Sequence, residues 1–432
     1  MKSRLVFWLV AALWVLAQFQ DRRWSVLEVF DHDGGGYYSY LPDLLLYGGP
    51  GRADSLTRLR QAAKPEQPEF SMQHMGIDPY PGGLVLAKYP LGVALGQLPW
   101  FAGAHLYAHY HHDPPNGFSR PYQQAVSVAG LVYGLVGLWV LRKLLRRYFA
   151  EAVVAWTLAA IGLGTNLLAY AAYEPLMAHA VLFMWQAALL YCTARWHESP
   201  RRRWAAGIGV FLGMAVLCRF TEALYVLVPL CWGLGTGSRL ARPTRYLDHL
   251  LLAAGLAAGV VSLQLFYWHA LSGHWFIRVY QGEGFTFAHP HVLEGLFSFR
   301  KGWLLYTPLM GLALLGTAWL RRSAVPQALG PVLVLLPVLL YVTFSWSPWW
   351  YGGGFSARPL ISAYPLLALP LAALLAASQR RGGVARAGLG AVLVAGVGLN
   401  LWQTWQWNGG LIDSIQETRA MYVERFFWRK FP

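Results

Sequence analysis

Residues 122–147 read YQQAVSVAGLVYGLVGLWVLRKLLRR: twenty uncharged, mostly apolar residues are followed by four basic residues within six positions. A helix of about 20 residues covers the hydrocarbon core of a bilayer. Lys and Arg beside such a run are typical of its cytoplasmic end. The stretch therefore predicts a transmembrane helix over 122–141, with the cluster Arg142–Arg147 in the cytoplasm.

Runs of this kind recur along all 432 residues, of which 56% are hydrophobic and only 13% are charged. A soluble domain has about 25% charged residues, so the composition excludes an ordinary soluble globular protein. We predict an all-α integral membrane protein that forms a single polytopic domain over residues 1–432. About eleven spans are expected, near residues 5–20, 122–141, 151–170, 176–195, 204–218, 220–235, 248–269, 303–320, 327–345, 359–378 and 387–402.

The net charge of +15 reflects topology. Of the 35 Lys and Arg residues, 18 lie in clusters between alternate spans with only three acidic neighbours, so that side carries the whole +15. The other side has 17 basic and 17 acidic residues and is neutral. Because cytoplasmic loops are enriched in Lys and Arg, we place these clusters and the N-terminus in the cytoplasm. The basic charge therefore predicts no nucleic-acid partner.

Two apolar stretches are assigned by the need to keep all basic clusters on one side. Residues 204–235 are flanked by basic residues at both ends, so we expect a tight hairpin that turns at Arg219–Glu222. Residues 89–108 look like a span, but counting them as one would place the cluster at 142–147 outside. Pro99 divides this run, and Pro bends or ends a helix. We expect a juxtamembrane or re-entrant pair of helices there.

The two ends of the chain carry further signals. Lys2, Arg4 and the short apolar core after them also fit a cleavable signal peptide, and with either interpretation residues 21–121 begin outside as the first outer loop. The tail over 403–432 mixes aromatic and charged residues. That mixture predicts an interfacial helix on the outer face.

The first outer loop opens with the sequence DHDGGGYYSYLP over residues 31–42. Asp31 and Asp33 are separated by one residue, so they can share a cation or a proton, and like charges this close raise one pKa. Three glycines follow and permit a ligand to approach the backbone closely. A solvated turn is the alternative interpretation of this motif.

This layout resembles the type-C glycosyltransferase superfamily, in particular the branch of protein O-mannosyltransferases and aminoarabinose transferases. In that family one span precedes a long outer loop with an Asp-x-x-x-Tyr motif, a spacing that Asp33 and Tyr37 match. The branch often has a second acid directly after the Asp, where this chain has Gly34. Asp31 is the possible substitute, so it stays open which carboxylate is the base. The resemblance implies a bacterial inner (plasma) membrane and active-site loops on the non-cytoplasmic face.

The resemblance also implies cations for a lipid phosphate, and the outer loops contain them. Lys88 ends the first loop at the membrane surface, where a snorkelling lysine is the alternative. Arg300 and Lys301 lie directly outside a span and break the positive-inside trend, which a bound phosphate would explain. The loop 346–358 combines three glycines with Arg358 and with aromatic residues suited to stack on a sugar, namely Trp349, Trp350 and Tyr351.

Further ionisable residues lie at or near membrane depth. Glu174 follows the third span and His179 lies just inside the fourth; such residues are functional candidates because their burial in lipid is costly. Arg219 and Glu222 have the (i, i+3) spacing of a structural ion pair. The sequence contains no Walker, zinc or dinucleotide motif, and it leaves a divalent metal open as a cofactor.

The preferred hypothesis is an inverting membrane glycosyltransferase that uses a polyprenyl-phosphate sugar donor and an unknown acceptor, which is a lipid, a glycan or a protein. Asp33 or Asp31 would act as general base, with Glu174 as a further catalytic candidate. The lipid-phosphate and substrate ligands would be Tyr37, Lys88, Arg300, Lys301, Arg358 and the aromatic residues of loop 346–358. One alternative is a non-enzymatic lipid or solute transporter or flippase, disfavoured by the lack of internal repeats. Another is a lipid-linked glycan ligase, which would carry its base on a large late loop.

Overall fold

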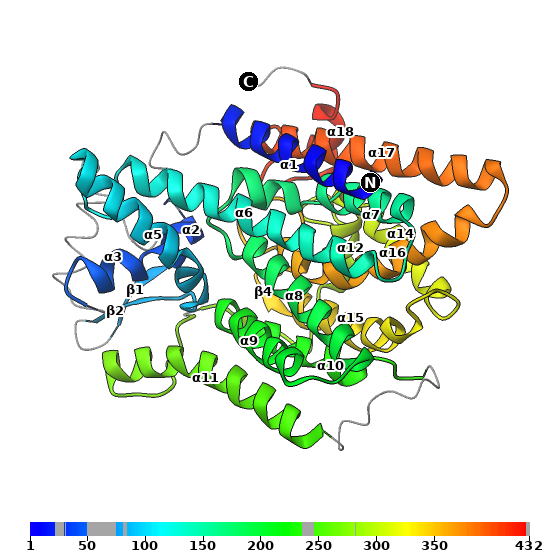
Figure 1. The fold of residues 1–432 in the computed structure, drawn as a ribbon. Coiled ribbons are helices and arrows are strands. Elements are labelled where there is room, and N and C mark those ends of the chain that lie inside the picture. The colour runs from blue at the N-terminus through cyan, green and yellow to red at the C-terminus, as the bar shows by residue number, and fades with distance from the viewer. Residues whose placement is uncertain are drawn as a thin grey trace.

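The computed structural model is built almost entirely of helices, as Figure 1 shows. The predicted all-α fold is confirmed. The structure describes residues 1–21, 30, 32–49, 75–80, 84–235, 246–280 and 282–428.

Six helical segments in these described ranges are long and apolar enough to cross a membrane. The prediction of an integral membrane protein is confirmed, whereas the count of about eleven spans stays a prediction. The six segments are Lys2–Gln20 in α1 (Lys2–Asp21), α6 (Arg120–Leu145), α11 (Leu247–Ser272), Pro326–Phe344 with α15 (Leu329–Phe344), Arg358–Gln379 with α16 (Tyr364–Gln379), and α17 (Gly383–Asn408).

Shorter or less apolar helices complete the bundle. They are α7 (Glu151–Leu163), α8 (Ala178–Glu198), α9 (Arg202–Cys218), α10 (Leu227–Cys231) and α14 (Leu309–Leu320). Helices α8 and α16 are buried along most of their length and form the core of the bundle. Helix α11 is apolar on all sides and scarcely buried, as a helix surrounded by lipid would be.

Helix α11 is held against α9 through two glycines. A Cβ atom at Gly209 would lie 2.3 Å from the Ala253 carbonyl oxygen, and one at Gly213 would lie 3.0 Å from the Ala257 Cα. Small residues four positions apart let helix backbones approach closely in a membrane. The α9–α11 contact therefore depends on close packing of backbones.

The apolar run at 89–108 forms one continuous helix, α5 (Gly92–His111), with Pro99 inside it. The expected pair of helices is wrong. A proline removes one hydrogen bond from a helix, and here packing offsets that loss. Phe101, Ala104 and Ala108 beyond the proline are buried in the same apolar cluster as Ala94 before it, so contacts on both sides keep the helix intact.

The predicted break at Arg219 is present. Helix α9 ends at Cys218, and Arg219 is extended with φ −158° and ψ 121°. The chain then continues in a 3₁₀ turn over Phe220–Val226 before α10. The Arg219 side chain therefore lies at the C-terminal end of α9, at the level of the outer loops, and does not face lipid.

The remaining elements lie in the predicted outer loops, at the start of the span predicted over 303–320, and in the tail. In the first loop they are α2 (His32–Tyr38), α3 (Tyr40–Leu45) and the hairpin of β1 (Ile77–Tyr80) and β2 (Leu84–Ala87). Two later loops are joined when β3 (Gly284–Phe285) pairs antiparallel with β4 (Trp346–Ser347). The other short helices are α12 (Val292–Phe297), α13 (Trp303–Tyr306) and α18 (Arg419–Arg425), the last of which lies in the tail.

Candidate active site

A cavity of about 970 Å³ lies where these loops meet. Its walls come from segments far apart in the sequence: the start of α2, residues 88–90, the region 170–179, the break after α9, residues 280–285, the loop 343–359, and residues 407–415. Most of these segments belong to the predicted outer loops. The fold therefore brings part of each predicted outer segment, 21–121, 171–175, 270–302 and 346–358, to one cavity.

Two of the three glycines in the first-loop motif, Gly35 and Gly36, are required by the packing of α2. A Cβ atom at Gly35 would lie 1.9 Å from the Phe30 carbonyl oxygen, and one at Gly36 would lie 1.9 Å from the Met75 carbonyl oxygen. Any side chain at either position would therefore displace backbone. The close approach that the glycine run permits is made by the chain itself, and this approach fixes the position of Asp33 at the start of α2.

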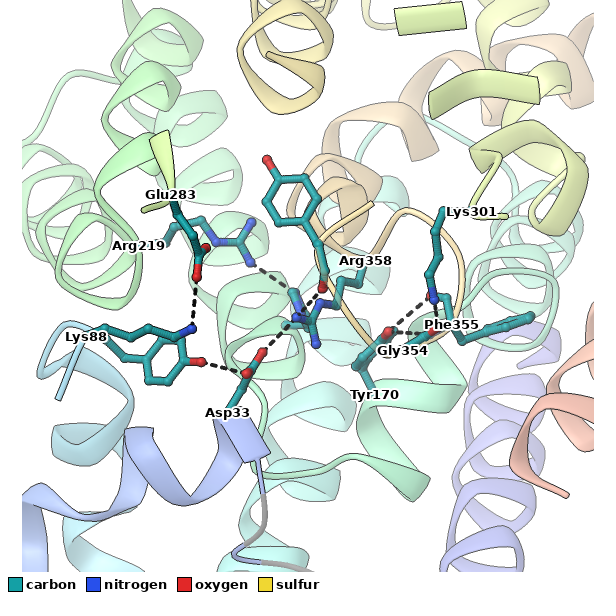
Figure 2. A network of polar contacts seen from close by, with 12 residues as sticks. Asp33, Lys88, Tyr170, Arg219, Glu283, Lys301, Gly354, Phe355 and Arg358 are labelled. Atoms are coloured by element: carbon teal, nitrogen blue, oxygen red, sulfur yellow. Dashed lines mark hydrogen bonds and ion pairs between the residues drawn. The ribbon is translucent and has the colours of Figure 1, made fainter. Parts of the chain in front are cut away.

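Asp33 is held at the cavity by two donors, as Figure 2 shows. The Tyr89 hydroxyl donates to its Oδ1 at 2.6 Å, and Arg358 Nη2 donates to its Oδ2 at 2.7 Å. Burial raises the pKa of Asp33, but Arg358, Tyr89 and Lys88 together outweigh burial, and the pKa lies below its ordinary value. Asp33 is therefore an ionised carboxylate at neutral pH, and its side chain keeps 27% of its surface exposed.

Arg358 reaches Asp33 because the loop before it turns sharply. Tyr351, Gly352, Gly354 and Ser356 all have positive φ, the left-handed region that glycine adopts without strain. Gly354 is further confined because a Cβ atom there would lie 2.7 Å from the Tyr170 hydroxyl. Arg358 Nη2 also donates to the Tyr351 carbonyl at 2.7 Å. The second glycine run thus shapes the turn that presents Arg358.

Arg219 is a second arginine in the cavity wall, and sequence reasoning treated it only as a structural partner of Glu222. That ion pair is present, with Arg219 Nη1 3.6 Å from Glu222 Oε1. Arg219 also donates to His179 Nδ1 at 3.1 Å and to the Pro359 carbonyl at 3.3 Å. The signal that would have found it is the cost of placing an arginine inside an apolar run.

Lys88 lines the cavity and joins two outer loops. Its Nζ lies 3.2 Å from Glu283 Oε1, a residue 195 positions later in the chain. The Lys88 amine also lies 5.3 Å from the centre of the Tyr89 ring. Tyr89 in turn stacks on Tyr37 with a distance of 4.3 Å between ring centres. Glu283 and Tyr89 are site residues that no pattern in the sequence singled out.

The structure separates the predicted site residues into two groups. The cavity lining includes Asp33, Tyr37, Lys88, Glu174, Tyr351 and Arg358. Four further residues that were predicted as ligands of the lipid phosphate or the sugar are not among the described residues of the lining, namely Arg300, Lys301, Trp349 and Trp350. Asp31 lies outside the described residues.

Metal binding has no candidate among the described residues, because no group of three or more His, Cys, Asp or Glu side chains is arranged to hold an ion. Three of the five acidic residues in the described lining are instead paired with cations of the chain. Asp33 pairs with Arg358, Glu222 with Arg219, and Glu283 with Lys88.

Comparison with known proteins gives two kinds of similarity. Residues 119–262 match the family model described as "Dolichyl-phosphate-mannose-protein mannosyltransferase". The structure is similar to that of ArnT from Cupriavidus metallidurans in the apo state, with a TM-score of 0.54 and 14% identity. The resemblance to the type-C glycosyltransferase superfamily is confirmed at the level of the fold.

The ArnT alignment covers 91% of this chain and 64% of the ArnT chain. The chain therefore spans less than two thirds of the length of that protein. A structure of ArnT from the same organism bound to undecaprenyl phosphate aligns with a TM-score of 0.49 and 16% identity, over 90% of this chain and 63% of that one. No curated protein sequence matches this chain.

Proposed function

We propose that this protein is a membrane glycosyltransferase that moves a sugar from a polyprenyl-phosphate-linked donor to a hydroxyl acceptor. The observation that carries the proposal is the cavity itself, where an ionised carboxylate, Asp33, lies in one hollow with Lys88 and Arg219. Transfer from a phosphate-linked sugar needs a base for the acceptor and cations for the departing phosphate. The matched family description supports a polyprenyl phosphate as the leaving group.

Asp33 would accept the proton of the acceptor hydroxyl as the acceptor oxygen bonds to the anomeric carbon. The bond between that carbon and the phosphate oxygen breaks at the same time, and the lipid phosphate leaves with the electron pair. Attack from the side opposite the phosphate inverts the anomeric configuration. Arg358 and Tyr89 keep Asp33 ionised and oriented, so the base is ready at neutral pH.

The leaving phosphate would be neutralised by Lys88 and Arg219, the two cations of the lining that are not paired with Asp33. Glu283 and Glu222, their partners, balance these charges while the cavity is empty of donor. Arginine binds phosphate with paired donors and lysine binds it as a point charge. The predicted outer segments 21–121, 171–175, 270–302 and 346–358 supply half of the described lining, which favours a site on the non-cytoplasmic face; an inner membrane is what the resemblance implies.

The test is sugar transfer from a radiolabelled polyprenyl-phosphate sugar by the purified protein in detergent. Asp33→Asn keeps the size and hydrogen-bonding groups of the side chain but removes the proton acceptor. Loss of general-base assistance is expected to lower turnover by about 10²–10⁴-fold, with thermal stability measured alongside. Glu174→Gln is the matched variant, because Glu174 lines the same cavity.

A wild-type protein that transfers no sugar from any polyprenyl-phosphate donor would contradict the proposed function. Full turnover in Asp33→Asn together with loss of turnover in Glu174→Gln would keep the function and move the role of base to Glu174.

A further inference from the structure

The side chains of Arg300 and Lys301 donate hydrogen bonds to backbone carbonyls of two segments that form the cavity wall. Lys301 is buried, with 2% of its surface exposed, and its Nζ donates to the Gly354 carbonyl. Arg300 Nε donates to the Ile415 carbonyl at 2.5 Å, and its guanidinium lies 3.5 Å from the centre of the Trp350 ring. Gly354 and Ile415 both line the cavity, although the two cations do not.

The Gly354 carbonyl belongs to the turn that presents Arg358. Two further side chains hold the next peptide: Phe355 N donates to the Tyr170 hydroxyl at 2.7 Å, and Asn166 Nδ2 donates to the Phe355 carbonyl at 3.3 Å. Figure 2 shows Lys301 at one end of this turn and the Arg358–Asp33 pair at the other. Only three residues separate Gly354 from Arg358, so movement of the first displaces the second.

The Lys301 amine is buried and its observed hydrogen-bond partner is a backbone carbonyl. Burial and the nearby positive charges of Arg358 and Arg300 lower the pKa of Lys301 to about 7, against the opposing effect of Asp413 and Glu417. A buried amine that lacks a hydrogen-bond partner is costly, and the Gly354 carbonyl is the partner observed. Either protonation state of the amine can donate to it.

We propose that Lys301 and Arg300 are positioning residues. Lys301 fixes the turn that holds Arg358 on Asp33, and Arg300 fixes the C-terminal segment 411–417 as a wall of the cavity. The effect on catalysis rests on the proposed glycosyltransferase function, whereas the effect on the two segments does not. The C-terminal tail is thereby part of the site. A second arginine holds the same segment, because Arg425 Nη1 donates to the Leu411 carbonyl at 3.4 Å.

Hydrogen–deuterium exchange of the purified full chain in detergent tests the structural part without any activity. Lys301→Met keeps the length of the side chain and removes its donor, and it should speed exchange at least about threefold in a peptide spanning 351–358. Arg300→Met should do so in a peptide spanning 411–417. Each variant is the control for the other, and a peptide from 178–198 reports the global fold. If Lys301→Met loses the fold, Lys301→Arg should restore it, because a donor is retained.

Transfer kinetics test the catalytic part. The titratable and charged groups that face Asp33 are Arg358, Lys88, Tyr89, Tyr37, Tyr170 and Tyr280. If Lys301→Met loosens Arg358, the pKa of Asp33 rises, and the acid limb of kcat/KM against pH should move upward by about one pH unit. Arg300→Met should lower kcat and leave this limb in place.

A raised KM for the donor lipid in Lys301→Met, with an unmoved acid limb and unchanged exchange at 351–358, would make Lys301 a phosphate ligand and overturn the proposal. Unchanged exchange with unchanged kinetics would overturn it as well. A wild-type protein without transfer activity would contradict the proposed function alone, because the exchange result still decides whether the two residues hold their segments.

Discussion

Arg358→Met should expose how much the site depends on one ion pair. The change removes the donor at 2.7 Å from Asp33 Oδ2 and leaves that carboxylate with the Tyr89 hydroxyl and a more distant Lys88. Breaking a fully buried pair costs about 3–5 kcal/mol, because the remaining charge has no partner. Asp33 retains 27% exposure and one hydrogen bond, so a loss of about 2–3 kcal/mol is expected.

The double variant Asp33→Asn, Arg358→Met should recover most of this loss, because neither charge then remains. The assay is the apparent unfolding temperature of the purified protein in one detergent at one scan rate, since unfolding of such proteins is generally irreversible. With an unfolding entropy of about 2.1 cal/mol/K per residue, a loss of about 2–3 kcal/mol in a chain of this size corresponds to a fall of roughly 2–3 °C. The double variant should unfold within about 1 °C of the wild type.

The pH dependence of the unfolding temperature follows from the pKa of Asp33. In the wild type the lowered pKa of Asp33 contributes stability that is present above its ordinary value of 3.8 and is lost as pH falls through the lower folded value. In Arg358→Met burial dominates and raises this pKa, which causes a penalty at neutral pH that shrinks as pH falls toward 3.8. The gap in unfolding temperature should narrow from pH 7 to pH 4. Additive losses in the double variant, or a gap that widens on acidification, would refute the role of the pair.

Two further predictions concern the walls of the cavity. Gly354→Ala should lower turnover at least about tenfold, because φ is +130° and the new Cβ would lie 2.7 Å from the Tyr170 hydroxyl. Gly353→Ala is the control and should retain activity, because a Cβ there meets only the Ser414 side chain at 3.8 Å. An equal loss of turnover in both variants would remove the steric argument. Lys88→Met should raise the KM for the donor lipid about 10–100-fold with a smaller change in kcat, because a charge-assisted bond to phosphate is lost. The same rise in Glu283→Gln would show that loss of the Lys88–Glu283 ion pair, and not loss of a phosphate ligand, explains the higher KM.

The fold could be predicted from sequence where a single physical effect dominates. Uncharged apolar runs bounded by basic clusters marked the helices, because burial of charge in lipid outweighs every local preference. The run at 89–108 was predicted as two helices because Pro99 removes a hydrogen bond and its ring clashes with the preceding turn, a local cost that favours a break. Contacts of Phe101 and Ala104 with residues distant in sequence compensate for it, and such contacts are invisible in a single sequence.

The candidate site could be predicted less completely, because loop side chains have no periodicity to fix their direction. The family motif selected Asp33, and charge together with a place in an outer loop selected Lys88 and Arg358; the structure brings all three to one cavity. The same reasoning selected Arg300 and Lys301, but adjacent residues of an irregular segment can point to solvent, ligand or backbone. Here the side chains of Arg300 and Lys301 donate hydrogen bonds to carbonyl groups of two other segments. Which of these directions a side chain takes depends on the assembled fold.

A structure of the purified protein determined by electron cryo-microscopy with a saturating polyprenyl phosphate would test the central claim most directly. The proposed function predicts phosphate density inside the cavity, within hydrogen-bond reach of Lys88 or Arg219 and on the side of the cavity that faces Asp33. The lipid chain should run from there between the helices. Phosphate density beside Arg300 and Trp350 at the outer surface, or a cavity that stays empty while the lipid binds elsewhere, would contradict it.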